Sequence, residues 1–259
     1  MTIWARELAA LDFETTGLSA EHGDRVVEVA VVRGGAGGPA RAWSTLVNPG
    51  RPVAATSVHG ITDAMVCGAP TFAQALPRLM AGLEGAVLVA HNARFDLSFL
   101  EMECARAGVS APDAPVLDTL GLARRVLPLA SHSLASVCAH FGIARDRAHR
   151  AADDAAATLD VAWRLLAMAD PGRRMSVDLA RGLCRRRTAA EQRAVAAVLQ
   201  KACDAHEPVL IDYQGAQRPD GLVTRRTITV RKVTANRVEA YCHLRGEDRI
   251  FRLDRIRLV

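Results

Sequence analysis

A chain of 259 residues, half of them apolar, is long enough for one large domain or for two smaller domains with their own cores. It has no run of about 18 uncharged apolar residues and no basic-then-apolar leader, so we expect neither a membrane span nor a secretory signal. Six scattered cysteines without a C-x-x-C pair argue against a zinc or dithiol motif and predict reduced thiols in the cytoplasm.

The net charge of +5 is unevenly distributed along the chain. Residues 1–170 carry 14 Arg and no Lys against 18 Asp and Glu, a net charge of −4. Residues 171–259 carry 19 basic side chains against 10 acidic ones, a net charge of +9. A basic unit next to an acidic one is typical of proteins that act on polyanions. The alternative is a basic surface that is merely solvated.

The first part of the chain alternates between predicted strands and helices. β-branched and apolar runs predict an antiparallel meander of three strands over residues 7–14, 24–32 and 41–47. Two short strands follow, over residues 86–91 and 116–117. Helical spacing of apolar residues predicts helices over 71–83, 93–107, 118–126, 133–141 and 151–168. Asn92 is a plausible N-cap for the second of these helices. We therefore expect an α/β domain with a mixed sheet flanked by helices over residues 1–170.

The second part differs in composition. The turn-forming sequence DPGRR at 170–174 predicts a domain boundary. We expect residues 171–206 to form a helical basic connector, because 175–205 has a helical, Arg-rich pattern. Strand-like runs then predict a small all-β domain over 207–259, with strands at 208–213, 223–233, 237–244 and 248–253.

Two acids, Asp12 and Glu14, end the first predicted strand, where acids are disfavoured. Residues i and i+2 of a strand share a face, so the carboxylates would lie about 7 Å apart along the strand. They would repel each other unless they were protonated or bridged by a cation. For an isolated D-x-E pair, a solvated strand end is the ordinary explanation.

Further acids and a histidine occur at the predicted helix starts. Asp96 begins one helix, Asp154 begins the long helix, and His149 lies five residues before Asp154. Taken singly, the acids would be helix-dipole partners and His149 a surface loop residue. As a set, oxygen ligands without cysteine are typical of Mg²⁺ or Mn²⁺ sites, and paired ions assist phosphoryl displacement. A histidine there could take a proton from an attacking water.

Three segments resemble the exonuclease motifs of the DEDDh superfamily, namely DFETTG (12–17), HNARFD (91–96) and HRAADD (149–154). Intervening segments also resemble proofreading epsilon-type subunits of bacterial DNA polymerase III, in the right order: SVHGIT (57–62), LDTL (117–120) and HSLASVCAHFGI (132–143). The resemblance covers roughly residues 7–168. It implies an RNase H-like fold and 3′→5′ removal of nucleoside monophosphates.

The resemblance also assigns roles to residues. It implies two divalent cations, Mg²⁺ or Mn²⁺, with His149 as general base and with four ligands: Asp12, Glu14, Asp96 and Asp154. Asp153 is a rival for the last ligand, but the family spacing favours the acid five residues after the histidine. Asp118 would be a supporting residue. The terminal-nucleotide pocket would be lined by Thr15, Thr16, His59, Gly60, Ile61, Asn92 and Phe95.

The C-terminal part resembles a WYL-type domain, a small Sm-like β-barrel, through DYQG (212–215), TRRTITV (224–230) and DRIFRLDRI (248–256). The Trp-Tyr-Leu triplet is absent, and RVEAYC (237–242) lies near its place. The resemblance suggests binding of a ligand or of single-stranded nucleic acid by basic residues, for which the candidates are Arg185, Arg186, Arg187, Arg249, Arg252 and Arg255. Alternatively, the last three only pair with neighbouring acids such as Asp254.

We therefore expect a cytoplasmic, metal-dependent 3′→5′ exonuclease that acts on single-stranded 3′ ends, with DNA favoured. An exoribonuclease would need a contact to the 2′-OH, which the sequence does not reveal. A non-catalytic sensor of nucleic acid or nucleotides, read by the C-terminal domain, is the alternative from another class. The complete set of acids and the histidine argues against an inactive protein. The sequence does not identify a polymerase partner.

Overall fold

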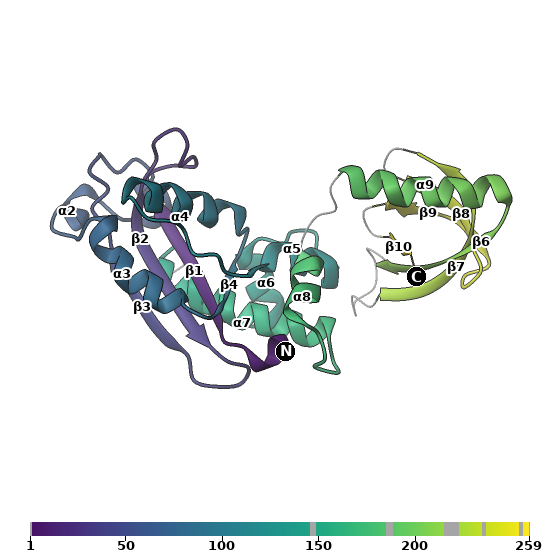
Figure 1. Ribbon diagram of the computed structural model, residues 1–259, viewed down its shortest axis with the longest axis horizontal. Helices are drawn as coiled ribbons and strands as arrows, with labels where there is room; N and C mark the ends of the chain where they lie inside the picture. Colours follow the sequence, from purple (N-terminus) through teal and green to yellow (C-terminus); the bar gives the residue numbers. More distant parts are fainter. Residues whose placement is uncertain are drawn as a thin grey trace. The chain divides into compact units, whose positions relative to one another are not determined.

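The computed structural model describes residues 2–145, 149–184, 189–214, 223–234, 237–253 and 256–258. The chain divides into two compact units, each with its own sheet (Figure 1). The first unit comprises Met1–Ala123 and Ser131–Cys184, and the second comprises Arg124–Ala130 and Arg185–Val259. No helix among the described residues is both long enough and apolar enough to cross a membrane.

The first unit contains a mixed five-stranded sheet with the order β3-β2-β1-β4-β5. Its strands are β1 (Leu8–Thr15), β2 (Val26–Gly34), β3 (Arg41–Leu46), β4 (Val87–Ala90) and β5 (Val116–Asp118). The first three form the predicted antiparallel meander, whereas β4 runs parallel to β1 and β5 parallel to β4. The prediction of a mixed sheet in this part of the chain is confirmed.

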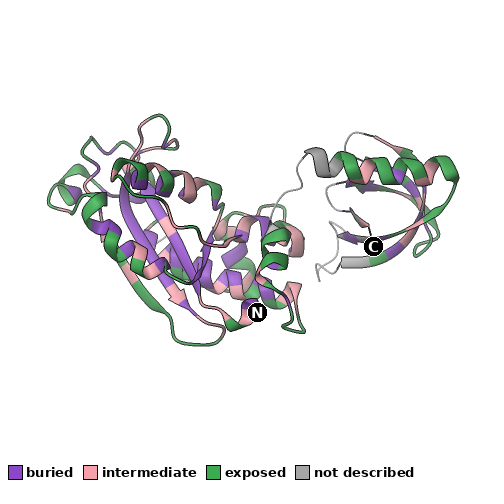
Figure 2. Cartoon of the chain, in the orientation of Figure 1, coloured by how far each residue is buried: buried purple, intermediate pink, exposed green. Residues whose placement is uncertain are grey.

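Helices flank this sheet, and Figure 2 shows its inner strands β1, β2 and β4 as largely buried, whereas the edge strand β3 has no buried residue. The helical segments are η1 (Ile3–Ala5), α1 (Thr56–His59), α2 (Asp63–Val66), α3 (Phe72–Leu83), α4 (Arg94–Arg106), α5 (Thr119–Val126), α6 (Leu134–Phe141), α7 (Ala151–Ala169) and α8 (Val177–Cys184). The side chains of Leu11 and Phe13 share a buried cluster with α3 and α4. Alternate residues of β1 point to the opposite face, and α7 packs there against β1 and β2. Asp12 and Glu14 therefore face α7.

The local signals for α3 and α4 had different outcomes. Thr71 caps α3 through a capping box with Gln74, which explains why this helix begins where its spacing predicts. For α4 the prediction of Asn92 as N-cap is wrong, because the N-cap is Ala93 and Asn92 has a left-handed backbone with φ 73°. The backbone N–H of Asn92 donates instead to Asp118 Oδ1 at 2.9 Å. The neighbouring parallel strand β5 thus supplies the acceptor for the start of α4.

The second unit contains an antiparallel sheet with the order β10-β6-β7-β8-β9. Its strands are β6 (Pro208–Gln214), β7 (Val223–Val233), β8 (Arg237–Cys242), β9 (Glu247–Arg252) and β10 (Ile256–Leu258). Four of them were predicted, while the short β10 was missed. Helix α9 (Ala189–Ala205) covers the sheet, with Leu199 in a core that includes Ile228 and Phe251.

The described residues bear on two expectations for this part of the chain, the Sm-like barrel and the helical connector. The described strand pairs form an open order, so closure into an Sm-like barrel is not seen among them. Of the helices in the predicted connector, α8 belongs to the first unit and α9 to the second. Arg185, Arg186, Arg187 and Arg255 lie outside the described residues.

Candidate active site

The predicted acids meet where three elements of the first unit end or begin. Asp12 and Glu14 lie near the carboxyl end of β1, Asp96 in the first turn of α4, and Asp154 in the first turn of α7. Because β1 and β4 are parallel, α4 starts at the same edge of the sheet where β1 ends. The backbone N–H of Phe13 donates to Asp96 Oδ1 at 3.2 Å and joins the strand to that helix.

Three of the predicted residues could hold a cation together. Ligand atoms of Glu14, His149 and Asp154 all lie within 4.8 Å of one another. Glu14 and Asp154 are buried, whereas His149 is exposed at the edge of the cluster. The cluster includes Asp154 and not Asp153. His149 has a left-handed backbone, with φ 62°, immediately before α7.

Crowding and burial raise the pKa values of the carboxyl groups. Burial is the largest cause of the rise in the pKa of Asp12 well above 3.8, and the nearby carboxylates of Asp96, Asp154 and Glu14 raise it further. The pKa of Glu14 is raised to about 7, first by burial and then by Asp154 and Glu28. Burial also raises the pKa of Asp96 to about 8, against hydrogen bonds from backbone N–H groups. Such groups cannot all ionise at neutral pH without added positive charge.

The donor set fits hard divalent cations. It contains carboxylate oxygens and no thiolate, and carboxylate oxygens are the ligands that Mg²⁺ and Mn²⁺ prefer. The pKa values of Asp12, Glu14 and Asp96 are raised because their negative charges are buried close together. A divalent ion would supply positive charge there and favour the ionised carboxylates. The geometry therefore supports a metal site formed by Glu14 at the end of β1 with His149 and Asp154 at the start of α7, and Asp12 and Asp96 are not part of this group.

One positive charge within the site comes from the protein itself. Arg145 donates to Asp154 Oδ1 from Nε at 2.9 Å and from Nη2 at 2.5 Å. Both side chains are largely buried. Arg145 also acts against the rise in the pKa values of Asp12 and Glu14. Sequence reasoning missed this residue, because nothing in the spacing marks an arginine nine residues before Asp154.

A second ion pair lies on the β2 side of the site. Glu28, opposite Glu14 in the β1–β2 register, is 3% exposed. Its carboxylate accepts hydrogen bonds from the Arg150 side chain and from the backbone N–H of Ala151. This pair was also missed, although an acid inside the apolar run VVEVAVV was a usable signal.

The residues predicted to line the nucleotide pocket lie around the end of β1. Thr15 and Thr16 are buried, and the Thr16 hydroxyl donates to Asp24 Oδ1 at 3.2 Å. His59 is buried and neighbours Thr15, and its pKa is lowered mainly by that burial. Its Nδ1 accepts the backbone N–H of Ile61 at 3.0 Å, so its Nε2 carries the proton of the neutral ring.

The rest of that predicted pocket has more exposed members. Gly60 ends α1 with φ 72°, which lets the chain turn back toward the sheet. Asn92 is exposed, and its carbonyl accepts the backbone N–H of the half-buried Phe95 at 2.9 Å. Phe95 directly precedes Asp96 and its ring lies 5.0 Å from that of Phe99. These side chains therefore lie beside the acids rather than among them.

The described basic candidates of the second unit lie on β9. Arg249 pairs with Glu247 at 3.4 Å, with both side chains well exposed. Exposed ion pairs of this kind contribute little to stability, so Arg249 stays available to another anion. Arg252 lies at the end of the same strand and is exposed.

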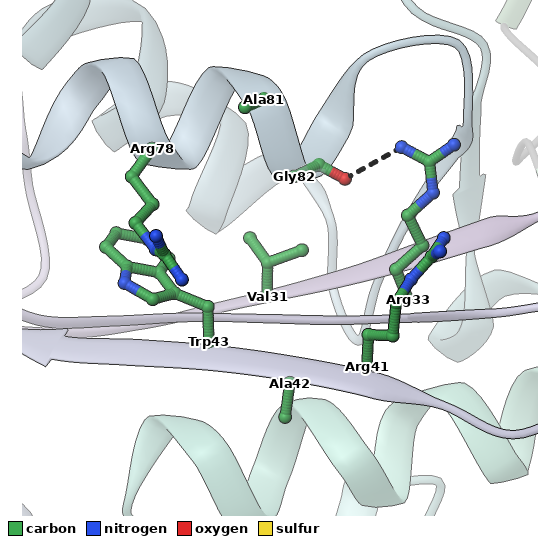
Figure 3. A pocket seen from close by; sticks show the side chains of 8 residues that line it. All are labelled: Val31, Arg33, Arg41, Ala42, Trp43, Arg78, Ala81 and Gly82. Carbon is green, nitrogen blue, oxygen red and sulfur yellow. Dashed lines mark hydrogen bonds between the residues drawn. The ribbon is translucent and has the colours of Figure 1, made fainter.

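A separate pocket of about 460 Å³ lies on the α3 face of the sheet (Figure 3). Arg78 lies beside Trp43 at one end of the pocket, and Arg33 and Arg41 lie together at the other end. Arg33 and Arg41 both pair with Glu7 at 2.7 Å. The pocket lies at the end of β2 where Arg33 pairs with Ala9 of β1. Glu14 pairs with Glu28 near the opposite end of the same two strands. It is therefore not part of the candidate active site.

Comparisons with known sequences match both parts of the chain. A family model described as Exonuclease matches residues 9–162, and one described as WYL domain matches residues 194–259. A DNA polymerase III subunit epsilon-like protein of Rhodobacter capsulatus is 45% identical over 162 residues, which are 60% of this chain and 23% of that relative. The chain thus matches less than a quarter of that relative's length.

Comparisons with solved structures show a similar fold. Exonuclease X, solved in complex with 5′ overhanging duplex DNA, aligns with a TM-score of 0.54 at 24% identity, over 69% of this chain and 99% of that one. Exonuclease I of E. coli, solved with a dT13 oligonucleotide, aligns with a TM-score of 0.58 at 17% identity, over 91% of this chain and 55% of that one.

Proposed function

Because the chain belongs to the exonuclease family and carries a WYL domain, we propose that it is a metal-dependent exonuclease that removes nucleoside monophosphates from 3′ ends. The observation that carries this proposal is the cluster of Glu14, His149 and Asp154. Asp12 and Asp96 lie close enough to this cluster that the charge of Glu14 raises the pKa values of both. A non-catalytic sensor would not need an exposed imidazole beside buried carboxylates.

Each group in the cluster has a role in this proposal. The ligands of two Mg²⁺ or Mn²⁺ ions would be Asp12, Glu14, Asp96 and Asp154. Bound there, the ions would polarise the scissile phosphate and lower the pKa of a bound water. His149 is exposed at the edge of the cluster, so its imidazole nitrogen can accept the proton of the attacking water. The turn from His59 to Ile61 and the residues Thr15 and Thr16 would hold the terminal nucleotide.

The proposed substrate is a single-stranded 3′ end, with DNA favoured over RNA. The support for DNA is the similarity to Exonuclease X and Exonuclease I, which were both solved with DNA, and the support for a single strand is the dT13 oligonucleotide in Exonuclease I. The match to the polymerase III relative covers too little of that protein to propose a polymerase partner.

The experiment compares DNA and RNA oligonucleotides of one sequence, each labelled at its 3′ end, with Mg²⁺, with Mn²⁺ and with EDTA. We expect labelled mononucleotide as the first product from DNA, only with a divalent ion, and slower release from RNA. Faster release from RNA would favour an exoribonuclease. A labelled oligonucleotide as first product, or no cleavage by the full chain, would overturn the proposal.

The second unit is proposed to hold the strand. Residues 185–259 of this unit carry 16 Lys and Arg against 9 Asp and Glu, a net charge of +7, and contacts to phosphates would release counterions and make binding salt-dependent. We expect Arg249→Gln with Arg252→Gln to flatten the salt dependence of DNA binding, measured in Ca²⁺, and to leave kcat unchanged. Equal slopes would show that this strand of the WYL domain does not contact DNA. We also propose that the WYL domain has the Sm-like barrel fold expected from the sequence.

A further inference from the structure

The long helix α7 begins without a local cap. Its N-cap residue, Arg150, makes no side-chain capping hydrogen bond. The first N–H groups of a helix have no partner within it, and a buried one must find an acceptor elsewhere. Here the backbone N–H of Ala151 donates to Glu28 Oε2 at 3.0 Å, so the cap is supplied by strand β2.

The same carboxylate also holds the side chain of Arg150. Arg150 Nη2 lies 2.6 Å from Glu28 Oε1, and Nε lies 3.0 Å from Oε2. The Glu28 side chain is 4% exposed and that of Arg150 is 29% exposed. Two-pronged hydrogen bonds between arginine and carboxylate fix orientation as well as distance. A negative charge at a helix N-terminus is stabilised further by the helix dipole.

The capped residues lie between two members of the proposed active site. His149 directly precedes Arg150, and the backbone N–H of Asp154 donates to the Arg150 carbonyl at 3.0 Å. Glu28 in turn lies opposite Glu14 in the pairing of β1 and β2. A single carboxylate therefore connects the strand pair that carries Glu14 to the helix start that carries the other two groups.

We propose that Glu28 is a positioning residue of the active site. Through Arg150 and Ala151 it sets the distance from Glu14 to His149 and Asp154. Both of its oxygens are already engaged by N–H donors, which argues against a role as a further metal ligand. This inference rests on the proposed function, and its test includes a measurement that needs no activity.

The chain offers a matched control in Glu103 of α4. Glu103 is 2% exposed and accepts hydrogen bonds from Arg25 at 2.6 and 2.9 Å and from the backbone N–H of Val26. It thus combines the same burial, the same kind of arginine pair and a backbone donor. It lies in the second half of α4, away from the turn that carries Asp96. Loss of Glu103 should lower stability without moving the start of α7.

The first measurement is amide hydrogen exchange of the metal-free full chain. In Glu28→Ala we expect the first turns of α7 to exchange at least about tenfold faster than in the wild type, because their cap is lost. Glu103→Ala should leave exchange there unchanged. Equal protection of this segment in wild type and Glu28→Ala would overturn the proposal, whether or not the protein is a nuclease.

The second measurement is steady-state cleavage of DNA at a temperature where all variants are folded. We expect Glu28→Ala to lower kcat at least about tenfold with little change in KM, because a misplaced group loses its alignment with the reacting atoms. Glu28→Gln keeps an acceptor for Ala151 and should recover part of kcat, while Glu103→Ala should stay within about twofold of the wild type.

The outcomes separate the two proposals. A kcat of Glu28→Ala equal to that of the wild type, or an equal loss in Glu103→Ala, would refute the positioning role. If Glu28→Ala does not fold, Glu28→Gln and Glu103→Gln replace it in both measurements. Glu28→Gln weakens the pairing with Arg150, so it should exchange faster at the start of α7 and have a lower kcat than the wild type, whereas Glu103→Gln should change neither. Absence of nuclease activity in the wild type would refute the proposed function and leave the exchange measurement decisive for Glu28.

Discussion

In the absence of divalent ions, the free energy of unfolding of the first unit should fall as the pH rises from 5 to 8. The pKa of Glu14 is raised from 4.5 to about 7 by burial and by its neighbours Asp154 and Glu28. The folded protein therefore binds this proton more tightly than the unfolded chain does. The contribution of Glu14 to stability is fully present below pH 4.5 and is lost as the pH rises through about 7.

The magnitude follows from the same two pKa values. Each pKa unit corresponds to about 1.4 kcal/mol, so ionisation of Glu14 lowers the free energy of unfolding by about 3 kcal/mol in the absence of a cation. Asp96, whose pKa is raised to about 8, acts in the same direction. Because a domain is stable by only about 5–15 kcal/mol, this loss is large enough to measure.

The assay is urea unfolding in EDTA, followed by tryptophan fluorescence. All three tryptophans, Trp4, Trp43 and Trp163, belong to the first unit, so the signal reports on the unit that carries the acids. Glu14→Gln should be about as stable as the wild type near pH 4.5 and more stable than it at pH 8. The exposed acid Glu101 of α4 provides a control, since Glu101→Gln also removes one carboxylate charge but lies on the protein surface.

Excess Mg²⁺ or Mn²⁺ should reverse the order at pH 8, because the wild type gains a ligand for the ion and Glu14→Gln loses it. The reasoning would be refuted if Glu14→Gln and the wild type had the same stability at pH 8 without metal. It would also be refuted if Glu101→Gln stabilised the protein as much as Glu14→Gln does.

Three further predictions concern the same motifs. Asp154→Asn should abolish cleavage while Asp153→Asn retains it, and the opposite result in an oligonucleotide assay would exchange their roles. His149→Ala should lower kcat about a hundredfold or more and leave the affinity for Mn²⁺, measured by calorimetry, nearly unchanged; a parallel loss of affinity would make it a ligand. In Gly17→Ala the new Cβ would lie 2.4 Å from Asp24 Oδ2, so urea unfolding should show a loss of about 1–3 kcal/mol; unchanged stability would contradict the tight packing.

Short-range patterns in the sequence determined most of the elements and the position of the acids. The period of two along a strand placed Asp12 and Glu14 on one face, and both face α7. Apolar spacing predicted α3 and α7, and β-branched runs predicted β2 and β7. These features depend on residues a few positions apart, so the sequence by itself was sufficient for them.

Contacts between distant parts of the chain were decided only by the tertiary structure. The start of α4 takes its acceptor from Asp118 on the neighbouring strand and not from Asn92. The start of α7 takes its acceptor from Glu28, which lies 123 residues away in the sequence. Arg145 pairs with Asp154 nine residues further on, a separation that matches neither the helix nor the strand period. A buried carboxylate must be hydrogen-bonded, and its donors are the groups that packing of the helices and strands brings within reach. Because these groups come from other parts of the chain, a local sequence pattern does not predict them.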